Sequence, residues 1–131
     1  MKNNEFTEMF KYLRENAGLS FRTLATNLGL SSTYIFDIEN GNREPNEKLI
    51  ELLISYYKLN SEQQRILYDA VANSTGNLPF DVIKYLKENP DEIDKVIQNM
   101  QENNFKKMWK FAHSKISKNI VSLQNDTFFI L

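Results

Sequence analysis

Apolar residues recur three and four positions apart along most of the chain, the spacing that places side chains on one face of an α-helix. The pattern predicts five helices in the first part of the chain, at residues 5–16, 20–28, 32–39, 45–57 and from 61 onward. Their expected boundaries are marked by capping and turn residues: Ser20, Gly29, Ser31, Gly41, Pro45 and a Ser61–Gln64 capping box. Their apolar faces predict one core: Phe6, Met9, Phe10, Leu13, Leu24, Ala25, Leu28, Ile35, Ile38, Leu49, Leu52, Leu53, Tyr56, Ile66, Leu67, Ala70 and Val71.

A polar stretch containing Gly76 and Pro79 is the clearest break in the helical pattern. We therefore expect an N-terminal domain at 1–73, a linker at 74–79 and a C-terminal helical region at 80–131. That region begins with a short helix at 80–87, and Asn89–Pro90 is a strong start signal for the next one. The polar residues 101–104 leave open whether 91–117 is one helix or two. The apolar residues 128–131 are expected to pack against another surface.

Composition narrows the class of protein. The 131 residues are 41% hydrophobic and 25% charged, with four Gly and three Pro, which favours an all-α soluble domain. No cysteine is present, so disulfides and thiolate metal sites are excluded. The single histidine, His113, lacks a second ligand at metal-binding spacing, so we expect no metal, no cofactor and no enzymatic activity. No apolar run is long enough to span a membrane, and a cytoplasmic location is expected.

Charge is unevenly distributed along the chain, although the formal net charge is only −1. Residues 1–60 carry 7 Lys/Arg and 8 Asp/Glu, residues 61–104 carry 4 and 8, and residues 105–131 carry 5 and 1. A nearly neutral N-terminal segment predicts weak non-specific attraction to nucleic acid. The basic residues beyond 105 are interpreted either as the solvated face of an amphipathic helix or as a second contact to a DNA backbone.

Four segments of the first 60 residues carry a resemblance to a known family. They are Leu13–Ser20 (LRENAGLS), Leu24–Ala25, Gly29–Ser31, and Tyr34–Pro45 (YIFDIENGNREP). In combination they resemble the helix-turn-helix domain of phage-repressor-like transcriptional regulators of the Cro/C1 or XRE type. The resemblance implies a five-helix repressor-like DNA-binding bundle whose third helix enters the major groove. A segment at 78–90 also resembles one found in some phage and mobile-element regulators.

The resemblance implies roles for particular residues of this chain. Base contacts would come from the third helix, through Ser32, Thr33, Phe36 and Asp37. Contacts to the DNA backbone would come from Ser20, Phe21, Arg22, Tyr34, Asn40, Asn42 and Arg43. A buried ion pair between Arg14 and Glu39 would tie the first helix to the third.

Two departures from the family affect the expected readout. Phe21 stands where the family often has Gln, and the base-reading positions hold no Arg, Gln or Asn. Thr33 and Phe36 could instead contact thymine methyl groups, with water or DNA shape supplying the rest of the discrimination. Ser31 is favoured as a helix cap only, while Asp37 could equally be a solvated helix residue.

Two functions are compatible with the C-terminal region. Its apolar positions Phe105, Met108, Trp109 and Ile116 form either part of a core or a seam between two copies of the chain. In the first function, the chain is a repressor that binds an inverted repeat of double-stranded DNA as a homodimer. In the alternative, the chain is an antitoxin or a host-factor-binding protein, whose C-terminal region binds a protein partner while the N-terminal domain represses its own gene.

Overall fold

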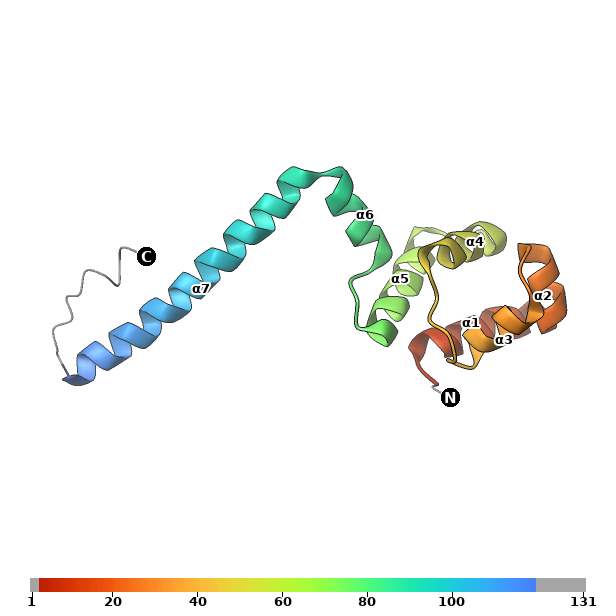
Figure 1. Ribbon diagram of the computed structural model, residues 1–131, viewed down its shortest axis with the longest axis horizontal. Helices are drawn as coiled ribbons and strands as arrows, with labels where there is room; N and C mark the ends of the chain where they lie inside the picture. The colour runs from red at the N-terminus through yellow and green to blue at the C-terminus, as the bar shows by residue number, and fades with distance from the viewer. Residues whose placement is uncertain (1–2, 120–131) are drawn as a thin grey trace. The chain divides into compact units, whose positions relative to one another are not determined.

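The computed structural model describes residues 3–119, with side chains for residues 3–112, and this part of the chain contains seven α-helices and no strand. The helices are α1 (Glu5–Asn16), α2 (Phe21–Leu28), α3 (Ser32–Glu39), α4 (Glu47–Tyr57), α5 (Ser61–Thr75), α6 (Phe80–Glu88) and α7 (Pro90–Asn119). Figure 1 shows their order along the chain. The expected all-α fold is confirmed.

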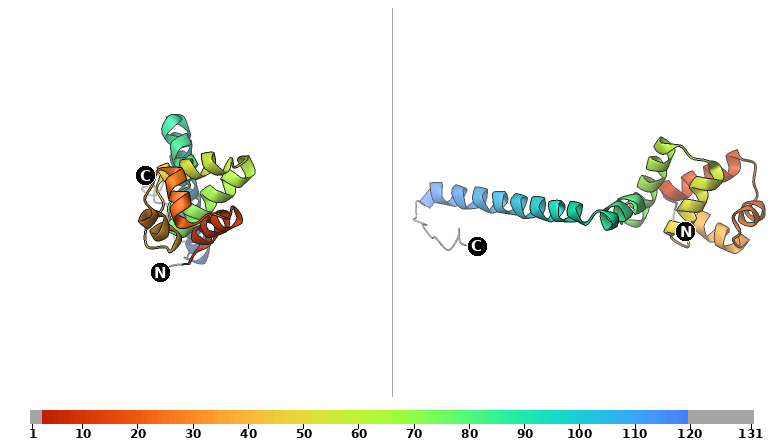
Figure 2. Two further views of the ribbon diagram at one scale, coloured as in Figure 1. Left: turned by 90° about the vertical axis from the view of Figure 1, so that its right-hand side faces the viewer. Right: turned by 90° about the horizontal axis from the view of Figure 1, so that it is seen from above.

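The chain divides into two compact units, Met1–Tyr85 and Leu86–Leu131. The views in Figures 1 and 2 agree that α1 to α5 gather into one bundle within the first unit. Its core consists of Phe6, Phe10, Leu24, Ala25, Leu28, Ile35, Ile38, Leu49, Ile50, Leu53, Leu59, Leu67, Ala70 and Val71. All but one of these residues come from the apolar faces of α1 to α5; Leu59 lies in the turn between α4 and α5.

Of the residues expected in the core, four are only half-buried, namely Met9, Leu13, Leu52 and Tyr56, and a fifth is exposed. Ile66 is 52% exposed, whereas the next residue, Leu67, is fully buried. Consecutive helical residues point about 100° apart, and the inward face of α5 is set by Leu67, Ala70 and Val71. Ile66 falls beside that face, so its prediction as a core residue is wrong.

Asparagine side chains set the start of three helices. The side chain of Asn46 accepts a hydrogen bond from the Leu49 amide, so α4 begins at Glu47 and not at Pro45 as the sequence predicted. Asn60 and Gln63 form the capping box of α5, one residue earlier than the predicted Ser61–Gln64 pair. An Asn amide oxygen satisfies a free helical N–H as well as a Ser hydroxyl does, so the nearest Asn displaces the expected cap. Asn4 caps α1 in the same way.

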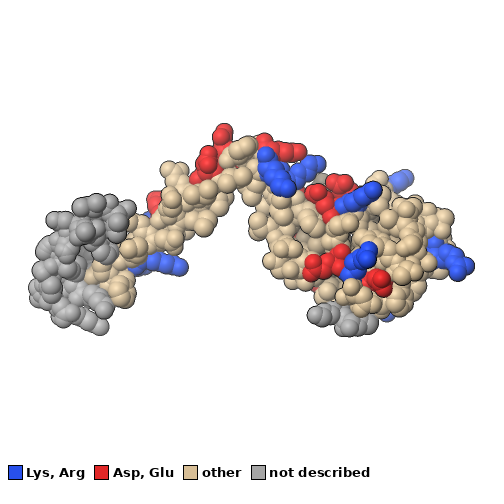
Figure 3. Space-filling model, in the orientation of Figure 1, with Lys and Arg blue, Asp and Glu red and all other residues tan. Residues whose placement is uncertain are grey.

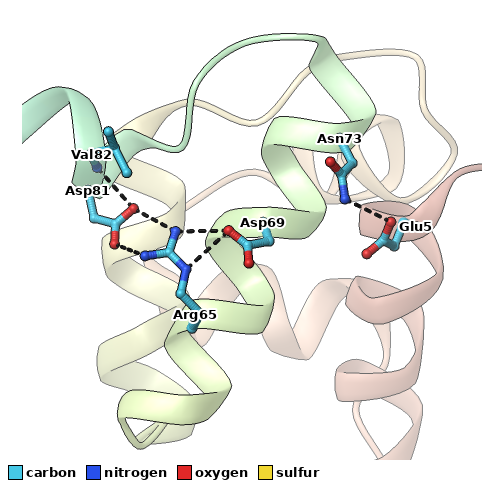
Figure 4. Close-up of polar contacts among 6 residues, drawn as sticks. All are labelled: Glu5, Arg65, Asp69, Asn73, Asp81 and Val82. Atoms are coloured by element: carbon cyan, nitrogen blue, oxygen red, sulfur yellow. Dashed lines mark hydrogen bonds and ion pairs between the residues drawn. The ribbon is translucent and has the colours of Figure 1, made fainter. Parts of the chain in front are cut away.

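Arg65 connects α5 to the start of α6 (Figure 4). Its guanidinium donates two hydrogen bonds to the Asp81 carboxylate, at 2.6 and 3.0 Å, and one to Asp69 at 3.1 Å. Phe80 packs against the core beside this network. The first unit therefore continues past the expected linker and includes the beginning of α6.

In the second unit, α7 is a single helix of 30 residues. This settles the question that the polar residues 101–104 left open. None of those residues is Gly or Pro, and so none breaks the helical hydrogen-bond ladder. No helix in the described part of the chain is long and apolar enough to cross a membrane. The prediction for residues 128–131 lies outside the described residues.

Candidate nucleic-acid interface

Two short helices joined by a tight turn form the centre of the candidate interface. The turn contains Gly29, whose φ of 72° ends α2 in the left-handed conformation that glycine adopts at little cost. Leu24 and Leu28 of α2 and Ile35 and Ile38 of α3 are buried, which fixes how the two helices cross. The opposite face of α3 remains accessible.

The four predicted base-contacting residues lie on this accessible face of α3. Ser32 and Thr33 at its first turn are exposed, Phe36 is 47% exposed, and Asp37 is half-buried. Residues three and four positions apart in a helix are neighbours on its surface, so the four side chains form one contiguous patch. The patch offers two hydroxyls, a carboxylate and an aromatic ring.

An ion pair joins α1 to the end of α3. Arg14 donates to the Glu39 carboxylate through Nε at 2.8 Å and through Nη2 at 3.0 Å, and its Nη1 donates to the Leu19 carbonyl at 2.8 Å. The side chains of Arg14 and Glu39 are only 12% and 7% exposed. The hydrogen bonds to Glu39 raise the pKa of Arg14, so its guanidinium stays charged. The pair fixes the position of α3 relative to α1.

Contacts of the Phe21 ring connect the Arg14–Glu39 ion pair to the exposed patch on α3. The Arg14 guanidinium lies over the Phe21 ring, 4.2 Å from its centroid. The Phe21 ring in turn meets Phe36 edge to face, with centroids 5.5 Å apart. Phe21 is only half-exposed and packs partly on the core. The sequence assigned Phe21 to the DNA backbone, and the structure places it beside a base-contact candidate.

Most of the other predicted backbone-contact residues lie at the start of α2 or at and just after the end of α3. Ser20 caps α2: its Oγ accepts from the Thr23 amide at 3.1 Å. Asn40 ends α3, and its side-chain amide donates to the Phe36 carbonyl at 2.9 Å. Arg22, Asn42 and Arg43 are exposed. The side chains of these last three residues are accessible to a phosphate group.

Tyr34 and Arg43 are brought together, which the sequence did not indicate. The Arg43 guanidinium lies 5.2 Å from the centroid of the Tyr34 ring. Burial raises the pKa of Tyr34, and the nearby Arg43 charge partly opposes that shift. A cation resting on a half-buried ring has fewer conformations than a free side chain, so Arg43 is oriented before any ligand arrives.

Tyr57 lies near the ion pair and was not singled out by the sequence. Among the described residues, its buried hydroxyl has no hydrogen-bond partner. Burial raises the pKa of Tyr57 to about 12, and the charges of Arg14 and Glu39 also act on it. No periodicity could have identified this hydroxyl, because the rest of the ring fits an ordinary core position.

The predicted partner-interface residues lie in the second unit. Phe105, Met108 and Trp109 are 53%, 49% and 38% exposed. The side chain of Ile116, like that of His113, lies outside the described residues. Among the described residues, no group of three His, Cys, Asp or Glu side chains is arranged to hold a metal ion.

Residues 5–66 match the family model of the helix-turn-helix domain. The matched range covers α1 to α4 and the first turns of α5, including every candidate DNA contact described above. The helix-turn-helix domain supports membership of a DNA-binding family. The chain has no significant match among curated proteins or solved structures.

Proposed function

We propose that the protein is a sequence-specific DNA-binding transcriptional regulator of the phage-repressor (Cro/C1, XRE) type, which represses a phage or mobile-element promoter. In this proposal, α3 of the helix-turn-helix domain enters the major groove. The observation that carries the proposal is the accessible patch of Ser32, Thr33, Phe36 and Asp37. Its position is fixed from behind by the Arg14–Glu39 ion pair.

The side chains of the patch can form contacts with more than one kind of base. The Ser32 and Thr33 hydroxyls can donate or accept hydrogen bonds, and Asp37 can accept from a cytosine amino group. Phe36 offers an apolar edge to thymine methyl groups. Ser20, Phe21, Arg22, Tyr34, Asn40, Asn42 and Arg43 surround the patch and would position the domain on the phosphates.

Few cations are available for phosphate contacts, so a single domain would bind weakly. Near the patch, the exposed basic side chains are Arg22 and Arg43. Two domains on an inverted repeat double the contacts and convert the second binding event into an intramolecular one. The proposal therefore includes a homodimer in which Phe105, Met108, Trp109 and Ile116 contribute to the seam. It includes no cofactor, metal or catalytic role, and places the protein in the cytoplasm.

The proposal is tested by selecting duplexes from a random library with the full chain and measuring their binding by fluorescence anisotropy. The expected result is an enriched inverted repeat bound in preference to unrelated duplex. Arg43→Ala should weaken binding to all sequences and reduce the slope of log K against log salt by about one. Lys11→Ala, which removes an exposed cation of α1, is the matched control and should leave both unchanged. Selection without enrichment, or equal effects of the two variants, would contradict the proposal.

A further inference from the structure

The long helix α7 carries exposed apolar side chains over most of its described length. They are Ile93, Val96, Ile97, Met100, Phe105, Met108, Trp109 and Phe111, each between 37% and 65% exposed. Large apolar side chains left exposed along one helix mark an interaction site. The question is which partner covers it.

The apolar stripe has the same spacing when read in either direction from Asn104. Met100 and Met108 lie four residues before and after Asn104, and Ile97 and Phe111 lie seven before and after it. Spacings of three and four residues place all five on one face of the helix. Of the apolar residues assigned to the seam in the proposed function, Met108 lies on this face, whereas Phe105 and Trp109 lie about 100° and 140° around the helix from Asn104 and flank it. A second α7 turned end to end would present the same series of positions: Met100 would face Met108 of the other copy, Ile97 would face Phe111, and Asn104 would face Asn104.

The charges of α7 favour the same arrangement. Residues 90–103 carry four acidic residues and one lysine, a net charge of −3, and residues 104–112 carry three lysines and no acid, a net charge of +3. Figure 3 shows acidic side chains near the start of the helix and basic side chains further along it. In an antiparallel pair each acidic half lies beside a basic half, whereas a parallel pair places like charges together.

We infer that α7 binds α7 of a second copy of this chain in an antiparallel pair centred on Asn104. A polar Asn within an apolar seam fixes register, because any shift would leave its amide facing apolar side chains. At a rise of about 1.5 Å per residue, the two Pro90 residues would lie about 40 Å apart along the pair. A parallel pair would place them only about 10 Å apart.

The antiparallel pairing deepens the proposed function, because it bears on how two recognition helices reach adjacent half-sites. Only this use of the pairing rests on the proposed function. Two recognition helices on adjacent half-sites lie about 34–36 Å apart, one turn of the duplex. Antiparallel pairing holds the starts of the two α7 helices apart by a distance of that order, which leaves room for two domains on adjacent half-sites. The pairing itself is a property of α7 and does not require DNA.

The orientation can be determined by cross-linking, because the chain contains no cysteine. Disulfides form only where two Cα atoms lie within about 7 Å. Met100→Cys and Met108→Cys are purified as full chains, mixed, and oxidised with copper phenanthroline. The antiparallel pair predicts efficient cross-linking in the mixture and little in either variant alone, because 100 and 100 of two copies lie about 12 Å apart. Asn104→Cys should cross-link alone and serves as the positive control.

Charge reversal tests the same inference without a thiol. In this register residues 90–103 lie opposite residues 105–118 of the other copy. One variant therefore changes Lys106, Lys107, Lys110, Lys115 and Lys118 to Glu, a second changes Asp91, Glu92, Asp94 and Glu102 to Lys, and a third carries all nine changes. Sedimentation equilibrium should show dimerisation about tenfold weaker in each single-half variant and restored in the third. Circular dichroism checks that each variant keeps its helix content, and variants that lose it are replaced by single reversals.

The outcomes separate this inference from the proposed function. A monomer, a parallel cross-link in Met100→Cys alone, or no rescue in the variant with both halves reversed would overturn the inference, and so would dimerisation only with a different protein. An antiparallel pair that binds no duplex would leave the inference standing and overturn the proposed function. A chain that binds its selected duplex without antiparallel pairing would do the reverse.

Discussion

The ring of Phe36 meets the ring of Phe21 edge to face, with centroids 5.5 Å apart and planes inclined by 71°. One ring is the exposed aromatic group of the reading patch, and the other lies under the Arg14 guanidinium. The contact therefore joins a proposed base-contact residue to the ion pair that fixes α3. An aromatic side chain with fewer accessible rotamers loses less entropy when it binds.

Phe21→Leu removes the edge-to-face contact while keeping an apolar residue at that position. We expect affinity for the selected duplex to fall about two- to twelvefold, because aromatic pairs of this geometry contribute about 0.5–1.5 kcal/mol. The free energy of unfolding should change by less than about 1.5 kcal/mol. Anisotropy titrations and urea denaturation measure the two quantities. An affinity equal to wild type would show that Phe36 needs no support from Phe21.

Arg14→Ala should lower the free energy of unfolding by about 3–5 kcal/mol, because it leaves the Glu39 carboxylate buried without its partner. Arg14→Leu combined with Glu39→Leu should recover most of that loss, since no buried charge remains. Arg22→Ala, at an exposed position, is the control and should change stability by about 0.5 kcal/mol or less. Urea denaturation of the four proteins gives the values, and equal losses for Arg14→Ala and Arg22→Ala would refute the structural role of the pair.

The buried hydroxyl of Tyr57 should make the free energy of unfolding fall as the pH rises above about 10. Burial raises the pKa of Tyr57 to about 12 in the folded protein, above the value of about 10 in the unfolded chain. The contribution of the neutral Tyr57 phenol to the free energy of unfolding is therefore complete below pH 10. It is lost as the pH rises from 10 to 12, and the free energy of unfolding should be about 1.3 kcal/mol lower at pH 11. Tyr57→Phe should remove this component.

The same substitution should not destabilise the protein near neutral pH, because the hydroxyl has no partner among the described residues. Tyr12→Phe, whose ring is 63% exposed, should retain the full alkaline loss and serves as the control. Unfolding free energies at pH 8 and pH 11 for the three proteins provide the comparison. A decline of equal size in Tyr57→Phe and wild type would exclude Tyr57 as its source.

Two helices end in a residue with the left-handed backbone conformation, one a glycine and the other a lysine. Removing the glycine should lower the stability of the protein, and introducing a glycine in place of the lysine should raise it. Gly29 ends α2 with φ of 72°, and an added Cβ would meet no atom within 4 Å, so Gly29→Ala should cost only the backbone strain of about 1 kcal/mol. Lys58 ends α4 with φ of 52°, so Lys58→Gly should stabilise by a similar amount. Thermal unfolding should show melting temperatures shifted about 4–8 °C down and up, respectively. Shifts of the same sign would contradict the assignment.

Much of the first unit followed from the sequence, because its local signals agree with its packing. Ser20 and Ser31 cap the helices they were predicted to cap, and Leu24, Leu28, Ile35 and Ile38 form the predicted buried faces. The helix starts predicted from Pro45 and Ser61 are each displaced, because an adjacent Asn supplies the cap of the helix. Choosing between neighbouring caps depends on how the chain enters the helix, which packing decides.

The candidate site was only partly predictable. The resemblance to phage repressors pointed to Arg14 and Glu39, and the structure joins them. The positions of Phe21 over Arg14 and beside Phe36 depend on side-chain rotamers and on the crossing of α2 and α3, which spacing along the chain does not encode. The Tyr34–Arg43 and Arg65–Asp81 contacts join separate structural elements and arise for the same reason.

The central claim is that the exposed face of α3 reads base pairs, and one measurement tests it most directly. The selection is repeated with Thr33→Ala and Phe36→Ala, with Ser55→Ala and Ile66→Ala as exposed controls on other helices. Loss of a base contact costs about 1–3 kcal/mol at the base pair concerned, so each α3 variant should relax the preference at specific positions of the half-site. The controls should reproduce the wild-type preference. Unchanged preferences in both α3 variants would contradict the account.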